Sequence, residues 1–255
     1  MDFLKVIIFG IVEGITEFLP ISSTAHLDLT RVLFNIPLSD FIKNFEITIQ
    51  LGAILAIVYL YRNKIFSSTL YFKKVLISLI PTAVIGFTFY KLIKDYLFGN
   101  TLLMIITLFI GGVLILYFEY YFKFKENKTR FEDLSNKDLI LLGIAQAFAI
   151  VPGVSRSLSV ILVGRLLAID KKLITEFSFL LAIPTMLSAT VYDLYKNGIN
   201  FEKEEWMNLS LGFIVSFFVA LFVVKWLLFY ISKKSFTVFG WYRIFISIIL
   251  ALILI

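Results

Sequence analysis

The sequence predicts an all-α integral membrane protein with six transmembrane helices and two re-entrant helical hairpins. Apolar residues make up 60% of the 255 residues and charged residues only 16%, and the mean hydropathy is +0.93. A soluble domain of this size is about 45–50% apolar and needs a charged surface. The chain has no cysteine, which excludes disulfides, thiolate metal sites and cysteine catalysis. We therefore expect a single membrane domain over residues 1–255.

Six segments are apolar over about the 20 residues that a helix needs to cross a bilayer. They cover residues 45–61, 75–92, 101–122, 174–194, 207–230 and 237–255. Lys and Arg in the connections set the orientation. If residues 62–74 face the cytoplasm, the inside connections carry 13 Lys and Arg and the outside connections carry 6. The positive-inside rule favours this arrangement, in which both termini lie outside.

Two further apolar segments, residues 3–30 and 139–168, are interrupted near their middle by Pro and small polar residues. The interruptions are Pro20–Thr24 and Pro152–Ser157. Each half is too short to cross a bilayer alone, and a broken helix is tolerated at membrane depth only where protein or water surrounds it. We therefore predict two re-entrant hairpins, the first dipping in from the outer face and the second from the inner face.

The two halves of the chain match at a constant offset of 132 residues. The matched pairs are Pro20 with Pro152, Ser23 with Ser155 and Phe45 with Phe177, and a one-residue slippage adds Gly10 with Gly143 and Glu13 with Gln146. This pattern predicts one repeat over about residues 1–122 and a second over about 139–255, joined by a polar loop at 123–138. Because each repeat has three crossings, the second is inverted, and the broken helices of both meet near the bilayer midplane.

The ionisable residues within the hairpins include Glu13, Glu17 and His26 in the first and Arg156 in the second. A charged side chain at the bilayer centre costs on the order of 3 kcal/mol, so this cluster indicates a functional site. Glu13 and Glu17 are four residues apart and share a helix face. Two carboxylates this close repel each other unless a cation or an arginine lies between them.

The single histidine, His26, follows Ser22 by four positions and Ser23 by three. On a helix the imidazole therefore shares a face with both hydroxyls, a spacing that lets it orient or deprotonate a serine.

The two hairpin turns together predict an anion cradle. Each turn presents free backbone N–H groups and the positive end of a helix dipole, and Arg156 adds a fork of donors suited to phosphate oxygens. The catalytic candidates are Glu17, His26, Ser23 and Arg156, the substrate-binding candidates are Ser22, Ser155, Ser157 and Gly153, and the metal-binding candidates are Glu13 and Glu17.

At both hairpins the sequence resembles the undecaprenyl-diphosphate phosphatase family, also called the bacitracin-resistance protein family. The matching stretches run Glu13-Gly-Ile-Thr-Glu17-Phe-Leu-Pro-Ile-Ser22-Ser23-Thr-Ala-His26 and Pro152-Gly-Val-Ser-Arg156-Ser157. One departure is Val160, which stands where the family pattern has a threonine. The resemblance implies a hydrolase in the plasma membrane of a prokaryote that removes the terminal phosphate of a C55 polyprenyl diphosphate, usually with a divalent cation. This reaction recycles the carrier lipid for cell-wall synthesis.

For such a reaction we expect the diphosphate between the hairpin turns, with Arg156 holding phosphate oxygens. Glu13 and Glu17 bind Mg²⁺ or Ca²⁺ that bridges the diphosphate without a complete protein cage, because hard cations prefer carboxylate and phosphate oxygens. Ser23 or His26 supplies the nucleophile, or His26 activates water, and the sequence does not choose among these routes. The polar first hairpin predicts a cavity open to the outer face.

The expected partners are the polyprenyl diphosphate and the bilayer, and a homodimer is left open. Nucleic acid is not expected, because the basic residues lie between the spans rather than in one stripe.

A secondary transporter or lipid flippase is the main alternative, because inverted repeats and broken helices that face an anion are also a transporter design. The clustered Glu, Ser, His and Arg side chains favour an enzyme. Glu46 and Gln50, four residues apart early in a span, are weaker candidates. Basic and acidic residues near span ends, or able to snorkel to the membrane surface, are expected to have no role in the site. These are Arg165, Glu119, Lys225 and Arg243.

Single-cysteine labelling of intact cells tests the orientation, and the absence of native cysteine makes the experiment clean. We expect Lys73→Cys and Lys128→Cys to be protected from an impermeant thiol reagent, because both positions fall in predicted inside connections. Asn197→Cys should react. The reverse pattern would overturn the predicted orientation.

Overall fold

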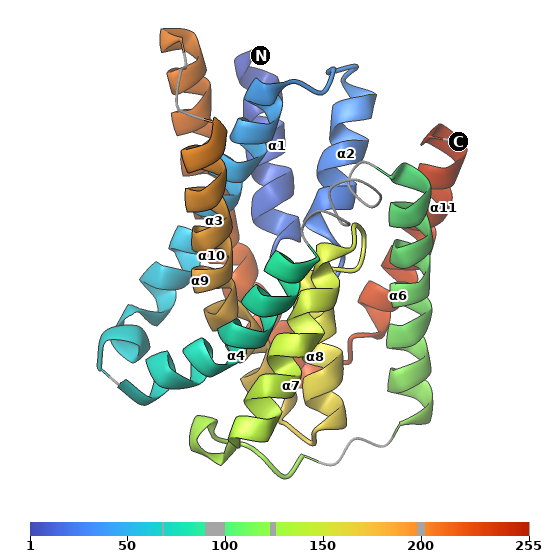
Figure 1. Ribbon diagram of the computed structural model, residues 1–255. Coiled ribbons are helices and arrows are strands. Elements are labelled where there is room, and N and C mark those ends of the chain that lie inside the picture. The colour runs from blue at the N-terminus through green and yellow to red at the C-terminus, as the bar shows by residue number, and fades with distance from the viewer. Residues whose placement is uncertain (68, 90–99, 123–125, 198–201, 255) are drawn as a thin grey trace.

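The computed structural model describes residues 1–67, 69–89, 100–122, 126–197 and 202–254. Within these ranges the chain is helical apart from turns, loops and one isolated bridge between Lys128 and Ile169, so the predicted all-α fold class is confirmed. Six of the described helices are long and apolar enough to cross a membrane. They are α3 (Asp40–Ser67), α4 (Thr69–Thr88), α6 (Thr101–Tyr121), α9 (Lys171–Asn197), α10 (Lys203–Lys233) and α11 (Thr237–Leu254) (Figure 1).

These helices match the six predicted spans, and several are longer than predicted. α3, α9 and α10 begin and end in polar residues outside the apolar stretch. Hydropathy marks only the part of a helix that fits the hydrocarbon layer, and the helix itself continues into the polar region. The last residues of the predicted span 75–92 and residues 123–125 of the predicted loop lie outside the described residues.

Each predicted hairpin consists of short helices joined by a turn. The first contains α1 (Phe3–Thr16) and α2 (Ser23–Leu33), and the second contains α7 (Asn136–Ala147), the 3₁₀ turn η3 (Phe148–Ile150) and α8 (Arg156–Leu166). α1 has 14 residues and rises about 21 Å, less than the roughly 30 Å of a hydrocarbon core. The hairpins extend from opposite ends of the molecule, and their turns meet near its middle (Figure 1). Their re-entrant course in a bilayer and the inverted relation of the two halves stay predictions.

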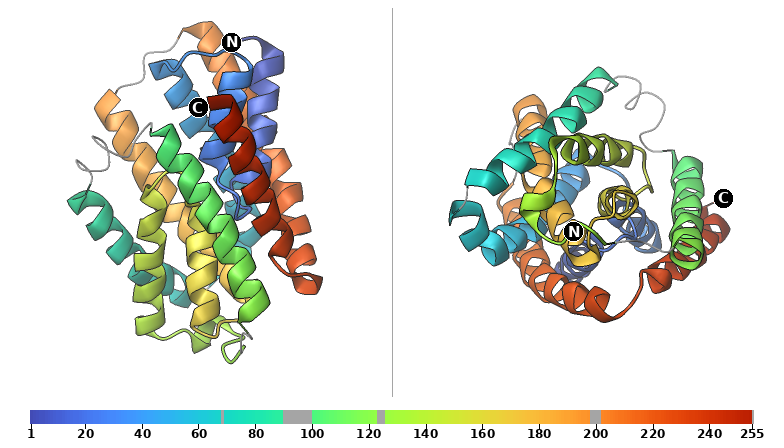
Figure 2. Two further views of the ribbon diagram at one scale, coloured as in Figure 1. Left: turned by 90° about the vertical axis from the view of Figure 1, so that its right-hand side faces the viewer. Right: turned by 90° about the horizontal axis from the view of Figure 1, so that it is seen from below.

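The hairpin turns lie inside the bundle among the long helices (Figure 2), whereas parts of the hairpin helices reach the surface. α1 packs along α10 and α7 packs along α4, so each hairpin leans on a helix from the other half of the chain. Glycines allow both approaches. A Cβ at Gly10 would meet the Gly212 carbonyl oxygen at 2.9 Å, and one at Gly143 would collide with Ser78. Small residues are the usual means by which membrane helices come this close.

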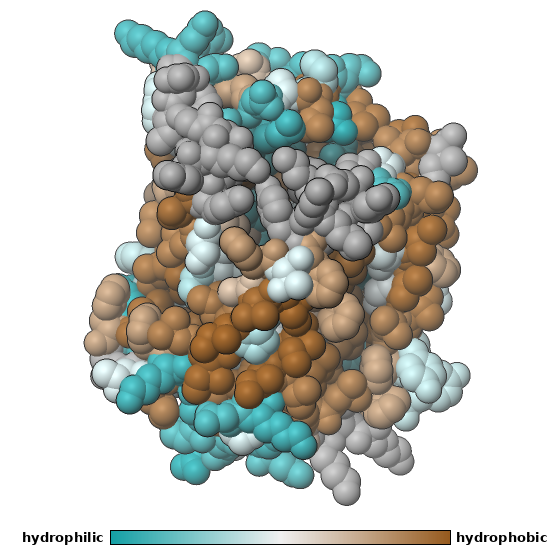
Figure 3. Space-filling model, in the orientation of Figure 1, coloured by the Kyte–Doolittle hydropathy of each residue, from teal (hydrophilic) through white to brown (hydrophobic). Residues whose placement is uncertain are grey.

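The outer surface carries an apolar belt. Large apolar side chains such as Phe87, Phe222 and Leu252 are 83%, 73% and 81% exposed. On the face shown in Figure 3, hydrophobic residues cover much of the middle, and hydrophilic residues gather at both ends. A water-soluble monomer rarely exposes so continuous an apolar surface. Lipid acyl chains are the environment that suits this belt.

The polar connection between the two halves is anchored to the bundle. Lys74 of α4 is 8% exposed, and its ammonium donates to three backbone carbonyl oxygens of the connection at distances between 2.7 and 2.9 Å. These belong to Phe131, Glu132 and Leu134, in and beside the 3₁₀ turn η2 (Phe131–Asp133). Lys128 and Asp138 form an ion pair of 2.7 Å near the start of α7. The connection therefore holds α4 and α7 together at this end of the molecule.

Gly143→Ala should destabilise the protein, because its Cβ would lie against the Ser78 carbonyl oxygen and push α7 away from α4. Overpacking of this kind costs about 1–3 kcal/mol, and thermal unfolding in detergent measures it. Gly86→Ala is the matched control. Its Cβ meets Ile150 Cδ1 at an ordinary 3.5 Å, so it should not lower the melting temperature. Equal melting temperatures for the two variants would mean that the close α4–α7 crossing is dispensable.

Candidate functional site

A cavity of about 220 Å³ lies where the two hairpin turns meet. Apolar residues of η3 and α9 close one side of it, and the rest of its wall is polar. The first hairpin supplies Glu17, Ser22, Ser23 and Thr24, the second supplies Gln146, Gly153, Ser155 and Arg156, and the long helices supply Gln50, Thr82 and Thr185. Both hairpins therefore contribute polar groups to one cavity, as the sequence predicts.

Both helices that begin at the cavity follow a serine with an unusual backbone. Ser22 precedes α2 with a φ of 71°, and Ser155 precedes α8 with a φ of 73°. Positive φ is uncommon outside glycine and persists only where the surroundings hold it. These two serines are 133 residues apart, one more than the offset in the predicted match of Ser23 with Ser155.

The two helix starts are capped differently. Ser155 Oγ accepts from the backbone N–H of Leu158 at 3.4 Å and caps α8, whereas the Ser22 side chain makes no capping bond to α2. The first N–H groups of a helix have no partner within the helix. Those of α2 therefore lack a serine cap at the cavity, which is the arrangement that an anion site uses.

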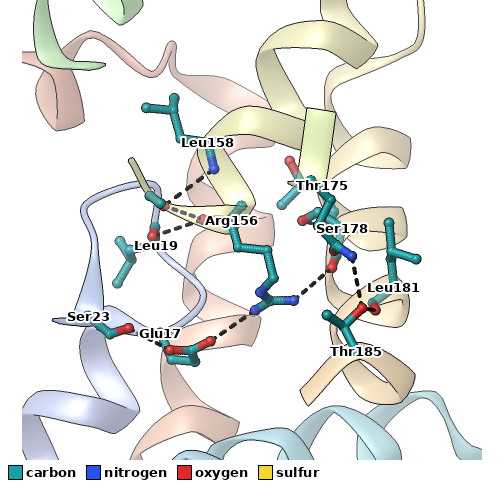
Figure 4. A network of polar contacts seen from close by, with 12 residues as sticks. Glu17, Leu19, Ser23, Arg156, Leu158, Thr175, Ser178, Leu181 and Thr185 are labelled. Carbon is teal, nitrogen blue, oxygen red and sulfur yellow. Dashed lines mark hydrogen bonds and ion pairs between the residues drawn. The ribbon is translucent and has the colours of Figure 1, made fainter. Parts of the chain in front are cut away.

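Glu17 joins the two hairpins. Arg156 Nη2 donates to Glu17 Oε1 at 3.0 Å, and Ser23 Oγ donates to Glu17 Oε2 at 2.6 Å (Figure 4). Arg156 Nη1 also donates to the Ser178 carbonyl oxygen of α9 at 3.3 Å. The side chains of Arg156 and Glu17 are only 12% and 4% exposed. The buried Glu17 carboxylate thus binds the guanidinium of Arg156 through one oxygen and accepts a hydrogen bond from the Ser23 hydroxyl at the other.

His26 is held by partners other than the serine hydroxyls. Its Nδ1 lies 2.7 Å from the Ser22 carbonyl oxygen, and its Nε2 lies 2.7 Å from the Tyr242 hydroxyl. A carbonyl only accepts, so Nδ1 donates, and the neutral ring accepts the Tyr242 proton at Nε2. His26 is not among the residues that line the cavity. Both ring nitrogens are therefore engaged away from Ser23 Oγ, whose proton points to Glu17.

Glu13 lies one helical turn before Glu17 and is not among the residues that line the cavity, but its carboxylate is of the kind that binds a cation. It is 1% exposed, and neither of its carboxylate oxygens has a hydrogen-bond partner among the described residues. Glu46 Oε1 of α3 is likewise buried and has no hydrogen-bond partner among the described residues. Burying such groups is costly unless they are satisfied, and a hard cation takes oxygen ligands of this kind.

A complete metal cage is not formed by the protein alone. In the described part of the chain, His, Asp and Glu side chains do not gather in threes around one point. A cation at Glu13 and Glu17 would therefore need further oxygen ligands from the substrate or from water.

Two positions of the second hairpin lie away from the cavity. Ser157 is 1% exposed and donates to the Leu19 carbonyl oxygen at 3.0 Å, and its Oγ lies 3.1 Å from Ser155 Oγ. Ser157 therefore ties the two turns together instead of facing the cavity. Val160, the departure from the family pattern, is 0% exposed in the apolar core.

Arg243 does not snorkel, contrary to expectation. It is 0% exposed, and backbone carbonyl groups occupy its guanidinium. Arg165 and Glu119 lie near helix ends, as expected. Arg165 forms an ion pair with Glu126, and Glu119 accepts from the Phe236 backbone N–H.

A neutral polar cluster in the cavity wall was not predicted. Gln146 Nε2 donates to Thr82 Oγ1 at 3.3 Å and to Thr185 Oγ1 at 2.8 Å. The two threonine hydroxyls donate hydrogen bonds to the carbonyl oxygens of Gly143 and Leu181, both at 2.7 Å. This fixes the amide, and Gln146 Oε1 has no partner among the described residues. One sequence feature points to the cluster: the tripeptide Ile-Pro-Thr occurs at both threonines.

The chain matches the family described as bacitracin resistance protein BacA over residues 6–249. Three similar proteins are named undecaprenyl-diphosphatase. The one from Aquifex aeolicus (strain VF5) is 46% identical over 247 residues, 97% of this chain and 96% of that protein. The one from Sulfurihydrogenibium sp. (strain YO3AOP1) is 47% identical over 250 residues, and the one from Methanococcus aeolicus is 44% identical over 252 residues, each covering 98% of both chains. The chain therefore belongs to the bacitracin resistance protein BacA family.

Proposed function

We propose that this chain hydrolyses undecaprenyl diphosphate to undecaprenyl monophosphate and inorganic phosphate in the cell membrane, and so recycles a lipid carrier for cell-envelope glycan synthesis. Membership of the BacA family and three relatives named undecaprenyl-diphosphatase support the substrate. The contacts of Ser23 and Arg156 with Glu17 are the observation that supports the reaction. They combine a hydroxyl, a carboxylate and a guanidinium, which are the groups that phosphoryl transfer through a serine requires.

In this mechanism the terminal phosphate lies near Arg156 and the N-termini of α2 and α8, which favour anions. Ser23 Oγ attacks the terminal phosphorus while Glu17 takes its proton. The bond from that phosphorus to the bridging oxygen breaks, and undecaprenyl monophosphate leaves with the electron pair. Water then attacks the phosphoserine, Glu17 returns the proton to Ser23 Oγ, and the water oxygen leaves in inorganic phosphate.

A divalent cation, Mg²⁺ or Ca²⁺, is part of the proposal as a partner of Glu13 and Glu17. The oxygens of Glu13, which have no hydrogen-bond partner among the described residues, support it. The two carboxylates would hold the cation together with oxygens of the diphosphate and of water. When bound, the cation neutralises charge on the transferred phosphoryl group.

The cavity is proposed to open toward the outer face of the membrane. The support is the excess of basic residues in the predicted inside connections, which puts both ends of the first hairpin outside. A site on that face meets the carrier diphosphate that is left there after glycan units are joined. Returning the monophosphate inward then requires a separate step, and the cysteine labelling above tests the orientation.

A transporter or flippase is not favoured. Beside Pro20 of the first turn, the described residues form a second void of only about 10 Å³, which is also lined by Glu119, Arg165 and apolar side chains. This is about the room that one water needs. This void is therefore too small for a phosphate group.

Phosphate release from undecaprenyl diphosphate by the detergent-purified protein tests the mechanism. Glu17→Gln and Arg156→Ala should each lower the rate at least about 100-fold, because each removes a preorganised charge contact at the reacting phosphate. Ser23→Ala should lower the rate of phosphate release as much, because it removes the attacking oxygen. Glu204→Gln, at an exposed position of α10, is the control and should keep its activity.

The outcomes separate the roles. Near-normal turnover by Ser23→Ala would assign the attack to water, and near-normal turnover by Glu17→Gln or Arg156→Ala would remove that residue from the site. No phosphate release by the unmodified protein would overturn the proposed function.

Chelation tests the cation. EDTA should abolish phosphate release, and added Mg²⁺ or Ca²⁺ should restore it. Glu13→Gln should raise the cation concentration for half-maximal activity about tenfold or more, because one of two carboxylate ligands loses its charge. Glu204→Gln should leave that concentration unchanged. Full activity in EDTA would exclude the cation.

A further inference from the structure

The last helix, α11, reaches both hairpin turns through two adjacent residues, Tyr242 and Arg243. The guanidinium of Arg243 donates to four backbone carbonyl oxygens at distances between 2.8 and 3.3 Å. These belong to Pro20 in the first turn, Gly153 in the second turn, and Thr107 and Leu108 in α6. One fully buried side chain therefore connects the two turns to each other and to a long helix.

The two turn carbonyls held by Arg243 stand at equivalent places. Pro20 and Gly153 each lie two residues before a serine with positive φ, Ser22 and Ser155 respectively. Each serine directly precedes a helix that begins at the cavity. Fixing the two carbonyls therefore fixes the separation of the two helix starts.

The surroundings of Arg243 suit an arginine and not a lysine. A guanidinium carries five N–H donors in a rigid planar fork, whereas an ammonium carries three on a point charge. Gly111 of α6 makes room for the fork, because a Cβ there would collide with the guanidinium. At the next residue, Gly112, a Cβ would meet the Gly240 carbonyl oxygen of α11 at 2.8 Å. The close crossing of α6 and α11 is therefore built around this side chain.

Tyr242 acts on the neighbouring part of the first turn. Its hydroxyl donates to His26 Nε2 at 2.7 Å, and the two rings are parallel to within 4°. His26 Nδ1 in turn donates to the Ser22 carbonyl oxygen at 2.7 Å. This chain of hydrogen bonds ends on Ser22, the residue before Ser23. The strained backbone of Ser22 depends on its surroundings.

We propose that Tyr242 and Arg243 form a clamp of positioning residues, which fixes the separation of the hairpin turns and thereby the contacts of Ser23 and Arg156 with Glu17. The proposal rests on the proposed function. Neither clamp residue lines the cavity, so the clamp acts through the turns. A displacement of about 1 Å at reacting groups can cost about 100-fold in rate. Looser turns therefore lower kcat more than they change KM.

Steady-state hydrolysis of undecaprenyl diphosphate distinguishes positioning from substrate binding. Arg243→Lys keeps the charge but loses donors, so kcat should fall at least about tenfold while KM stays within about threefold. Tyr242→Phe removes one hydroxyl and should lower kcat in the same way but less. Arg62→Lys is the matched control, because Arg62 is exposed and donates to the Tyr59 carbonyl oxygen. Its kcat and KM should equal those of the unmodified protein.

A distance measurement adds a readout that a loss of stability alone does not move. Spin labels on Leu33→Cys and Leu166→Cys report the separation of α2 and α8, because the chain has no other cysteine and these positions are 60% and 49% exposed. In the folded, monodisperse fraction, the distance distribution should broaden in Arg243→Lys and Arg243→Gln and stay narrow in Arg62→Lys. If Arg243→Gln does not fold, Arg243→Lys and Tyr242→Phe carry the test.

Unchanged kcat and an unbroadened distance distribution in Arg243→Lys and Tyr242→Phe would overturn the clamp. A raised KM with unchanged kcat would also overturn it, because Arg243 would then belong to phosphate binding. Failure of the proposed function looks different: the unmodified protein releases no phosphate, and the distance distributions still decide whether the two residues fix the turns.

Discussion

A backbone that leaves the helical conformation inside a hydrocarbon layer must find partners for its carbonyl groups, and this requirement organises the centre of the molecule. Side chains from other elements meet it. Thr107 donates to the Pro152 carbonyl, Ser157 donates to the Leu19 carbonyl, and Arg243 donates to the carbonyls of Pro20 and Gly153. The first two bonds each join one half of the chain to the turn of the other half. The broken helices therefore bind the halves together.

Because the turn carbonyls have hydrogen-bond partners, the groups that the turns present to a ligand are backbone N–H groups and a few charged side chains. Glu17 neutralises Arg156, so the cradle does not rest on a large excess of positive charge. Glu13 remains, a buried carboxylate without a hydrogen-bond partner in the described part of the chain. Folding alone does not explain such a group, since unsatisfied buried polar atoms in native proteins concentrate at functional sites. The proposed cation, shared with a diphosphate, would give this buried carboxylate a partner.

Hydropathy located the six spans because lipid requires a helix to be apolar along its length. The same physics exposed Glu17 and Arg156, since ionisable residues inside a membrane are rare. Spacing along the chain did not identify the partners. His26 shares a helix face with two serines, yet its imidazole bonds Tyr242, 216 residues away, because the packing of α11 brings a hydroxyl there. Arg243 has the sequence context of a snorkelling residue, and only tertiary structure distinguishes it from one.

Alternating access would require one half of the chain to move against the other. In this protein the bonds between the halves converge on the site itself, including the ion pair of Glu17 with Arg156 and the bond of Ser157 to the first turn. Breaking a buried pair so that one charge is left alone costs about 3–5 kcal/mol. The same motion would separate Ser23 from the arginine that Glu17 holds beside it. A movement of one half against the other would therefore break the contacts that the proposed phosphoryl transfer needs. This favours a fixed cradle, to which the lipid brings its headgroup while its tail stays in the apolar layer.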